Sequence, residues 1–171
     1  MTRSSIDAWA LSLAVVTAKR GTCLRRQVGC VLLDARRRVL ATGHNGVARG
    51  LPHCNEAIFG EEVPTSGPYG VRPVLHPHAC AGAKLKSGMG LDTCEAVHAE
   101  VNACLQCGDV MAIESCYVTV SPCVSCTKLL MNTGCRRIVF RTPYIQDETS
   151  RALWEKLPGR TWEHFVEEPT P

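Results

Sequence analysis

Apolar and polar positions follow a helical spacing at the start of the chain, over residues 5–20. Ser4 or Ser5 precedes this stretch as a candidate N-cap and Gly21 follows it as a stop, which predicts an amphipathic helix. The stretch differs from a signal peptide, because Lys19-Arg20 stands where small residues would mark a cleavage site. No apolar run approaches the roughly 18 residues that a membrane span needs. We therefore expect a cytoplasmic protein, with no membrane partner, whose cysteines are reduced.

Two strand-like runs follow the helix, Gln27 to Leu33 and Val39 to His44. The turn residues Asp34 to Arg37 separate them, which predicts a β-hairpin. From Gly46 to Thr93 the periodicity is lost, and this stretch holds most of the proline and glycine of the chain. We expect a long loop or insertion at about 55–93, which needs something to hold it in place.

Helix and strand patterns alternate beyond residue 97. The predicted helices are 97–106, 123–132 and 147–156, and the predicted strands are 115–120, 137–141 and 162–166. This alternation favours strand–crossover–strand units, and hence a parallel portion of sheet behind the hairpin. With no repeat, linker or second domain in the pattern, the sequence predicts a single α/β domain over residues 1–171.

Composition and charge add little to this picture. Hydrophobic residues make up 45% and charged residues 20% of the 171, and the net charge of +3 is too small to indicate a nucleic-acid partner. Seven basic residues against one acid give +6 between Lys19 and Arg38. A basic patch beside a site suits an anionic substrate, while a solvated run explains Arg36 to Arg38 equally well. The eleven cysteines point to metal binding or a catalytic thiol in an intracellular protein.

Two short motifs carry the candidate chemistry. His98-Ala99-Glu100 opens one predicted helix, and Pro122-Cys123-Val124-Ser125-Cys126 opens the next. Together they match the H-x-E…P-C-x-x-C signature of zinc-dependent nucleobase deaminases. Zinc prefers four tetrahedral ligands and a catalytic site keeps one position open, so we predict His98, Cys123 and Cys126 as the three protein ligands. Both sets begin helices, where N–H groups and the helix dipole favour a thiolate over a thiol.

Glu100 stands two residues after His98, near the expected metal but on another side of the helix. It is therefore placed to carry protons and not to bind zinc. The hypothesis is that Glu100 takes a proton from the attacking water, gives it to N3 of the base, and then protonates the departing amine.

The remaining cysteines of the predicted core have a simpler interpretation. Cys104-Leu105-Gln106-Cys107 has the same C-x-x-C spacing, but it lies near the end of a helix with no third ligand close in sequence. We interpret this pair as core thiols, and interpret Cys30, Cys116 and Cys135 in the same way.

Longer stretches of the chain resemble the deoxycytidylate (dCMP) deaminases. Thr22 to Gly29 reads TCLRRQVG, as in that family, and Thr42 to Cys54 reads TGHNGVARGLPHC against the family's TGYNGAPRGLPHC. The likeness continues through Cys94, His98 to Ala103, Tyr117 to Thr119 with Pro122-Cys123, and Arg137 to Phe140 with Tyr144. It covers about residues 5–150, apart from much of 57–78.

The resemblance implies a cytidine-deaminase-like three-layer α/β/α sandwich with a mixed five-stranded sheet, in a homo-oligomer that is often a hexamer. It implies zinc-dependent conversion of dCMP to dUMP and ammonia, which feeds thymidylate synthesis. Asn45 would contact the sugar, the backbone at Ala99 the base, and Tyr144 the substrate. Arg25 and Arg26 are candidates for the 5′-phosphate or a nucleotide effector, with a carboxylate at a subunit interface as the alternative partner.

A second, structural zinc is also implied by the resemblance, at Cys23, Cys54, Cys80 and Cys94. Four thiolates make a closed tetrahedral site that would pin the long loop to the catalytic helix. His53, His76 and His78 are possible substitutes, and buried free thiols are the alternative.

The chain departs from the family pattern in the loop that contacts nucleotide in relatives. His44 stands for the family's Tyr and Val47-Ala48 for its Ala-Pro. Activation by dCTP with Mg²⁺ and inhibition by dTTP, both common in the family, are therefore left open. The extra residues between Cys54 and Cys80 leave open a 5-substituted dCMP as substrate.

Two other functions compete with this reading. A deaminase of cytosine or adenine in a polynucleotide would share the zinc chemistry, but it should carry a basic stripe with stacking aromatics, and aromatics are only 5% here. A zinc-stabilised binding protein without activity would have no need of Glu100 beside the ligands.

Overall fold

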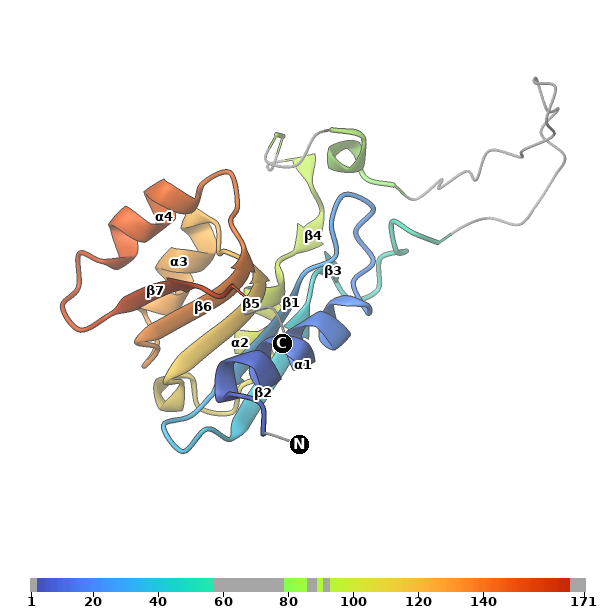
Figure 1. The fold of residues 1–171 in the computed structure, drawn as a ribbon. Coiled ribbons are helices and arrows are strands. Elements are labelled where there is room, and N and C mark those ends of the chain that lie inside the picture. Colours follow the sequence, from blue (N-terminus) through green and yellow to red (C-terminus); the bar gives the residue numbers. More distant parts are fainter. Residues whose placement is uncertain (1–2, 57–78, 86–88, 91–92, 167–171) are drawn as a thin grey trace, which may run out of the picture.

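The computed structural model, which describes residues 3–56, 79–85, 89–90 and 93–166, is built on a five-stranded sheet. Its order is β2-β1-β5-β6-β7 (Figure 1). The strands are β1 (Gly29–Leu33), β2 (Val39–His44), β5 (Ser115–Val120), β6 (Arg137–Thr142) and β7 (Thr161–His164). β1 pairs antiparallel with β2 and β5, and β6 pairs parallel with β5 and β7. The predicted hairpin, parallel portion and mixed sheet are confirmed.

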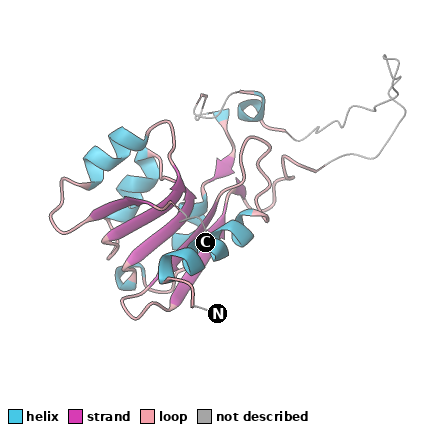
Figure 2. Cartoon of the chain, in the orientation of Figure 1, coloured by secondary structure: helices cyan, strands magenta, loops and turns pink. Residues whose placement is uncertain are grey.

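Within the described residues, four α-helices lie on the two faces of this sheet (Figure 2). They are α1 (Ile6–Ala18), α2 (Ala99–Gln106), α3 (Val124–Met131) and α4 (Asp147–Trp154). α1 begins where predicted, since the Ser5 Oγ accepts a hydrogen bond from the Ala8 N–H at 3.1 Å. None of the described helices has the length and apolar character to cross a membrane.

Alternation along the strands divides the core into two layers. Val31 and Leu33 of β1 pack with α1, whereas Cys30 and Leu32 point to the opposite face. That second face is filled by side chains of α2, α3 and α4, among them Ala103, Leu130 and Trp154. The result is the three-layer α/β/α sandwich expected from the sequence.

The core thiols behave largely as predicted. Cys30, Cys116 and Cys135 are fully buried, and the sulfurs of Cys30 and Cys116 lie 3.5 Å apart. Cys104 is buried in α2, but Cys107 is only half-buried at its C-cap. All eleven cysteines are free.

The start of the helix predicted at Val97 was wrong, and the strand predicted from Gln27 starts at Gly29. Val97 does not belong to the helix but to a short strand, β4 (Ala96–Val97), which pairs antiparallel with β3 (Gly46–Val47). That pairing requires extended backbone, so the helix starts after His98, whose φ of −72° and ψ of 156° mark it as the N-cap.

The stretch from 46 to 93 is also less irregular than predicted. Besides β3 it contains a 3₁₀ turn, η1 (Ala81–Lys84), and a second such turn, η3 (Val110–Ala112), follows α2. Elements of two to four residues are too short to show a period in the sequence. Residues 57–78, 86–88 and 91–92, which include His76 and His78 and most of the predicted insertion, lie outside the described residues.

The basic turn Arg36 to Arg38 lies at the end of the hairpin opposite to Val28 and Asn45, and its residues are exposed. Arg38 pairs with Asp34 at 2.6 Å, and the Asp34 carboxylate accepts the N–H groups of Arg36 and Arg38. Of the two interpretations of this run, the structure favours the solvated surface.

Candidate active site

The sheet topology brings several strand ends and helix starts together at one edge of the sheet, where they form the site. β1 begins at this edge, while β2, β5 and β6 end there, because β1 runs antiparallel to β2 and β5. The segments beside these strand ends therefore meet, as happens at the carboxyl edge of many α/β sheets. α2 and α3 both start at this edge, each directly after an extended segment.

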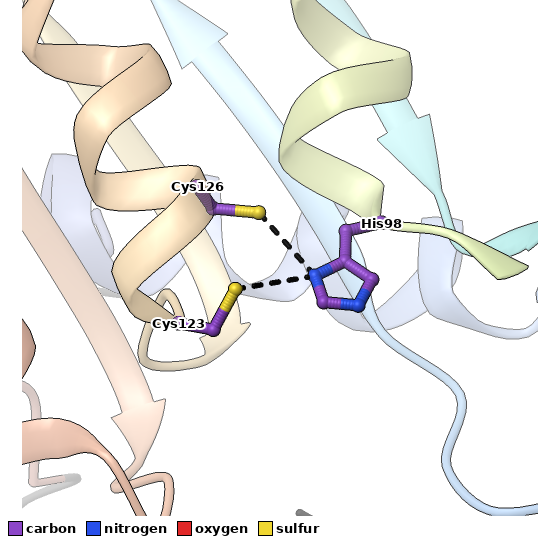
Figure 3. A group of neighbouring side chains, drawn as sticks. All are labelled: His98, Cys123 and Cys126. Atoms are coloured by element: carbon purple, nitrogen blue, oxygen red, sulfur yellow. Dashed lines mark hydrogen bonds between the residues drawn. The ribbon is translucent and has the colours of Figure 1, made fainter. Parts of the chain in front are cut away.

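The three predicted zinc ligands come together at these helix starts. His98 is the N-cap of α2, Cys123 is the N-cap of α3, and Cys126 lies in the first turn of α3 (Figure 3). His98 Nδ1 is 3.4 Å from the Cys123 sulfur and 3.3 Å from the Cys126 sulfur. Tetrahedral zinc bonded to nitrogen and sulfur would separate such atoms by about 3.6 Å, so the group fits zinc. Among the described residues, it is the one group of three or more His, Cys, Asp or Glu side chains that could hold a metal ion.

The charge state of the thiols also suits a metal. Cys126, His98 and the Cys126 N–H lower the pKa of Cys123 to about 4, although burial acts in the opposite direction. The adjacent Cys123 thiolate and burial raise the pKa of Cys126. The two shifts favour the thiolate at Cys123 and the thiol at Cys126, and a bound cation would favour the thiolate at both.

Glu100 follows in the first turn of α2 and is only 4% exposed. Burial raises the pKa of its carboxyl, while His98 acts to lower it. The carboxyl also interacts with the Cys126 thiol, so it borders the metal group without being part of it.

A cavity of about 590 Å³, including its open mouth, lies over this group and holds every residue predicted to touch substrate. Its lining includes His98, Glu100 and Cys123 from the metal side. It also includes the predicted substrate residues Arg25, Arg26, Asn45, Ala99 and Tyr144.

Asn45 follows β2 and is 7% exposed. Its Oδ1 accepts the Val28 N–H at 2.8 Å, and its Nδ2 donates to the Arg26 carbonyl at 2.7 Å. An amide has two donor hydrogens and two acceptor lone pairs, so one of each is left for a further partner.

Arg25, Arg26 and Tyr144 form the polar wall of the same cavity. Arg26 Nη1 is buried and has no hydrogen-bond partner among the described residues, whereas Arg25 Nη2 donates to the Met89 carbonyl at 3.0 Å. Burial raises the pKa of Tyr144, and the charges of Arg25 and Arg26 oppose that shift. Two cationic side chains and a hydroxyl thus line the same cavity, an arrangement that suits an anion.

Cys23 and Cys94 also line the cavity, and the four cysteines predicted for a structural zinc interact in pairs. Cys80 contacts the thiols of Cys54 and Cys94. Burial would raise the pKa of Cys80, but the N–H groups of Glu95 and Ala83 and the neighbouring thiols lower it on balance. The ligand atoms of His98, Cys123 and Cys126 all lie within 4.8 Å of one another, and among the described residues the four sulfurs of this second group are not all that close.

Two positioning contacts were missed from the sequence. Ser121 is buried, lines the cavity, and accepts the Tyr144 N–H on its hydroxyl at 2.8 Å. The Gln146 Oε1 accepts the Val124 N–H at 3.4 Å, at the start of α3. Ser121 could have been noticed because it precedes Pro122-Cys123, but nothing in the sequence pattern marks Gln146.

Comparison with known proteins agrees with this geometry. The family model for the cytidine and deoxycytidylate deaminase zinc-binding region matches residues 4–142. The chain belongs to this deaminase family. Among curated deaminases of the family, the deoxycytidylate deaminase of Schizosaccharomyces pombe is 32% identical over 155 residues, with 88% of this chain and 41% of that protein covered. The deoxycytidylate deaminase of Mycobacterium phage D29 is 33% identical over 141 residues, with 82% of this chain and 97% of that protein covered.

The chain spans about two fifths of the fission-yeast deaminase and of the Saccharomyces cerevisiae deaminase, 41% in each case. Among solved structures, the dCMP deaminase of cyanophage S-TIM5 in complex with dCMP and dUMP has a TM-score of 0.62 and 20% identity. That match covers 95% of this chain and 99% of the cyanophage chain, and it confirms the deaminase fold.

Proposed function

We propose that this chain catalyses the zinc-dependent hydrolysis of dCMP to dUMP and ammonia. One observation carries the proposal: a single cavity joins the His98, Cys123 and Cys126 group to Glu100 on one side and to Arg26 and Tyr144 on the other. The two sides offer what a nucleotide deaminase requires, a metal with a proton carrier for the base and cations for the phosphate.

Zinc held by His98, Cys123 and Cys126 supplies Lewis acidity, which makes water a stronger nucleophile at neutral pH. Glu100 takes one proton from the attacking water and delivers it to N3 of cytosine while the oxygen bonds to C4. The carboxyl then carries the second proton of the water to the amino nitrogen, and the C4–N bond breaks to release ammonia. The burial of Glu100 beside the cavity supports this role.

The rest of the cavity is proposed to hold the nucleotide. The backbone at Ala99 approaches the base, and the free donor and acceptor of Asn45 contact the sugar hydroxyl. Arg26, with Arg25 and Tyr144, binds the 5′-phosphate. The buried Arg26 Nη1 supports this assignment, because a buried guanidinium nitrogen without a partner is costly unless a ligand completes it.

The choice of dCMP over other cytosine compounds rests on the relatives. The fission-yeast, budding-yeast and phage D29 proteins are all named deoxycytidylate deaminases. The phage protein is matched over nearly its whole length, which supports the same activity in a chain of this size.

The test is ammonia release by the zinc-loaded protein, offered dCMP, CMP, deoxycytidine and 5-methyl-dCMP separately, with and without Mg-dCTP. We expect turnover of dCMP and a loss of about 10²–10⁴-fold in Glu100→Ala, with its zinc retained. The exposed Glu148→Ala is the matched control and should keep the wild-type rate.

Each other result would contradict part of the proposal. Turnover only of 5-methyl-dCMP or another member of the panel would replace the substrate. Inactivity on all four compounds, with tight and salt-sensitive binding to single-stranded oligonucleotides, would favour a polynucleotide deaminase. Equal inactivity of wild type and Glu100→Ala on every compound would favour a binding protein.

Further features of the family extend the proposal. We propose a structural zinc at Cys23, Cys54, Cys80 and Cys94, supported by the contacts of Cys80 with two of the other thiols. We also propose a single cytoplasmic domain that assembles into a homo-oligomer, a hexamer by resemblance. Regulation by dCTP with Mg²⁺ and by dTTP belongs to the same resemblance, and the Mg-dCTP arm of the assay tests it.

A further inference from the structure

The segment that carries Arg26 is the loop 21–28 between α1 and β1, which has no regular secondary structure. A cationic side chain on such a loop binds a phosphate well only if the backbone beneath it is fixed, since each ordered torsion otherwise has a cost on binding.

Asn45 makes four hydrogen bonds to this loop. Its side chain accepts the Val28 N–H and donates to the Arg26 carbonyl, at 2.8 and 2.7 Å. Its backbone N–H donates to the Val28 carbonyl and its carbonyl accepts the Thr22 N–H, each at 3.2 Å. One buried residue therefore ties both ends of the loop and the backbone of Arg26 itself.

Asn45 is in turn fixed to the catalytic helix. Asn102, one turn along α2 from His98, donates from Nδ2 to the carbonyl of His44 at 2.7 Å. His44 directly precedes Asn45 and ends β2. The path from α2 to Arg26 therefore runs through the Asn102 hydrogen bond, the chain from His44 to Asn45 and the Asn45 hydrogen bond, all at buried or half-buried residues.

The packing around Asn45 leaves its amide little freedom. A Cβ at Gly21 would lie 2.8 Å from the Asn45 Oδ1, so glycine there makes room for the amide oxygen. Gly21 is also fixed within the loop, because its carbonyl accepts a hydrogen bond from Gln27 Nε2 at 2.8 Å. The amide is thus enclosed by the segment it supports.

We infer that Asn45 is a positioning residue for Arg26, and that through it the enzyme distinguishes a nucleotide from a nucleoside. The inference rests on the proposed function, in which Arg26 binds the 5′-phosphate. Asn45 would then have two roles. One donor hydrogen and one lone pair of its amide hold the loop, and the remaining donor and lone pair contact the sugar.

The two roles make different predictions for substrates. dCMP and deoxycytidine share the same sugar, so loss of a sugar contact lowers kcat/KM for both by the same factor. Loss of Arg26 positioning lowers kcat/KM for dCMP alone, because deoxycytidine has no phosphate. The change in the ratio of the two constants isolates the positioning role.

The experiment compares wild type, Asn45→Ala, Arg26→Ala and the double variant, all zinc-loaded. We expect Asn45→Ala to reduce the ratio of kcat/KM for dCMP to kcat/KM for deoxycytidine about 10- to 100-fold, mainly through KM. This is the size expected for loss of the charged hydrogen bond between Arg26 and the phosphate. In the double variant Asn45→Ala should add to the dCMP loss caused by Arg26→Ala only the factor by which it lowers kcat/KM for deoxycytidine, that of the sugar contact, because Arg26 is no longer there to be positioned. Asn132→Ala is the matched control, since its Nδ2 also donates to a backbone carbonyl, that of Lys128, but in an exposed helix end.

A ratio that stays within about threefold of wild type, with additive losses in the cycle, would overturn the inference. Deoxycytidine turnover by Asn45→Ala reports that the variant is folded, and if that variant does not fold, Asn45→Ser enters the same cycle. If deoxycytidine turnover is too slow to measure, the cycle on dCMP decides alone. Failure of wild type to deaminate dCMP would instead refute the proposed function, so the two failures are distinguishable.

Discussion

Gly43 shows how much of the site depends on one missing side chain. It lies in β2, and a Cβ there would come within 2.2 Å of the Ala99 carbonyl oxygen and 2.4 Å of the Ala103 nitrogen. Both are backbone atoms of α2, so neither can move aside alone. Gly43→Ala must shift the helix that carries His98 and Glu100, and we expect it to cost about 1–3 kcal/mol in stability and to weaken zinc binding. Urea unfolding and competition with a zinc chelator measure the two effects.

Gly108 provides the control for this prediction. It follows α2 and a Cβ there would meet nothing within 4 Å, so Gly108→Ala should leave stability and zinc affinity nearly unchanged. Wild-type zinc affinity in Gly43→Ala would mean that α2 can retreat from the sheet without disturbing the ligands.

At the scale of elements, one charged cluster holds four of them together at the edge of the sheet opposite to the cavity. Arg137 in β6 binds the Asp7 carboxylate of α1 through both Nη atoms, at 2.7 and 2.9 Å. It also binds Glu163 of β7, at 2.9 Å through Nε, and the hydroxyl of Tyr117 in β5. The Arg137 hydrogen bond, assisted by Tyr117 and opposed by burial, lowers the pKa of Asp7.

Asp7→Asn removes the charge and keeps the shape of the side chain. Because the folded-state pKa of Asp7 lies below its unfolded value of about 3.9, its contribution is present above that pH and is lost as pH falls through the folded pKa. We expect the variant to be less stable by about 1–2 kcal/mol at pH 7, after allowance for partial exposure, and the difference to shrink in acid. Urea unfolding of both proteins across pH 7 to 3 measures it.

The exposed pair Arg151 and Glu155, on α4, is the control for Asp7. Its side chains are 57% and 43% exposed, so Glu155→Gln should leave the free energy of unfolding nearly unchanged at any pH. A pH-independent loss in Asp7→Asn would assign its effect to packing in place of charge.

At the scale of the whole molecule, the features that could be predicted from the sequence are those that depend on local residue patterns. Periodicity located the five strands, and motif spacing identified His98, Cys123 and Cys126 because both motifs begin helices. It missed the β3–β4 pairing, since two-residue strands have no period. It could not reveal the bonds of Asn45, because an amide in sequence does not show whether it faces a ligand or its own backbone.

The four cysteines of the proposed structural zinc belong to this largest scale, since they join four segments distant in sequence. Cys23 lies in the loop that carries Arg26, Cys54 follows β3, Cys80 precedes η1 and Cys94 precedes β4. Gly82 already brings η1 against Cys94, because a Cβ there would lie 2.8 Å from the Cys94 Cα. A metal shared by these thiols would fix the wall of the cavity as well as the chain around it.

Cys80→Ser tests this, because Cys80 contacts two of the other three thiols. We expect wild type to carry a second equivalent of zinc that the variant lacks, while the zinc at His98 is retained. The Tm of the variant should be about 10 °C lower. A structural zinc contributes several kcal/mol to the free energy of unfolding, and each kcal/mol changes Tm by about 2–4 °C in a chain of this size. Cys107→Ser, at a half-buried thiol outside the group, should keep both metals. One zinc equivalent in wild type, measured by elemental analysis, would refute the structural site and leave the loops to be held by buried thiols and hydrogen bonds.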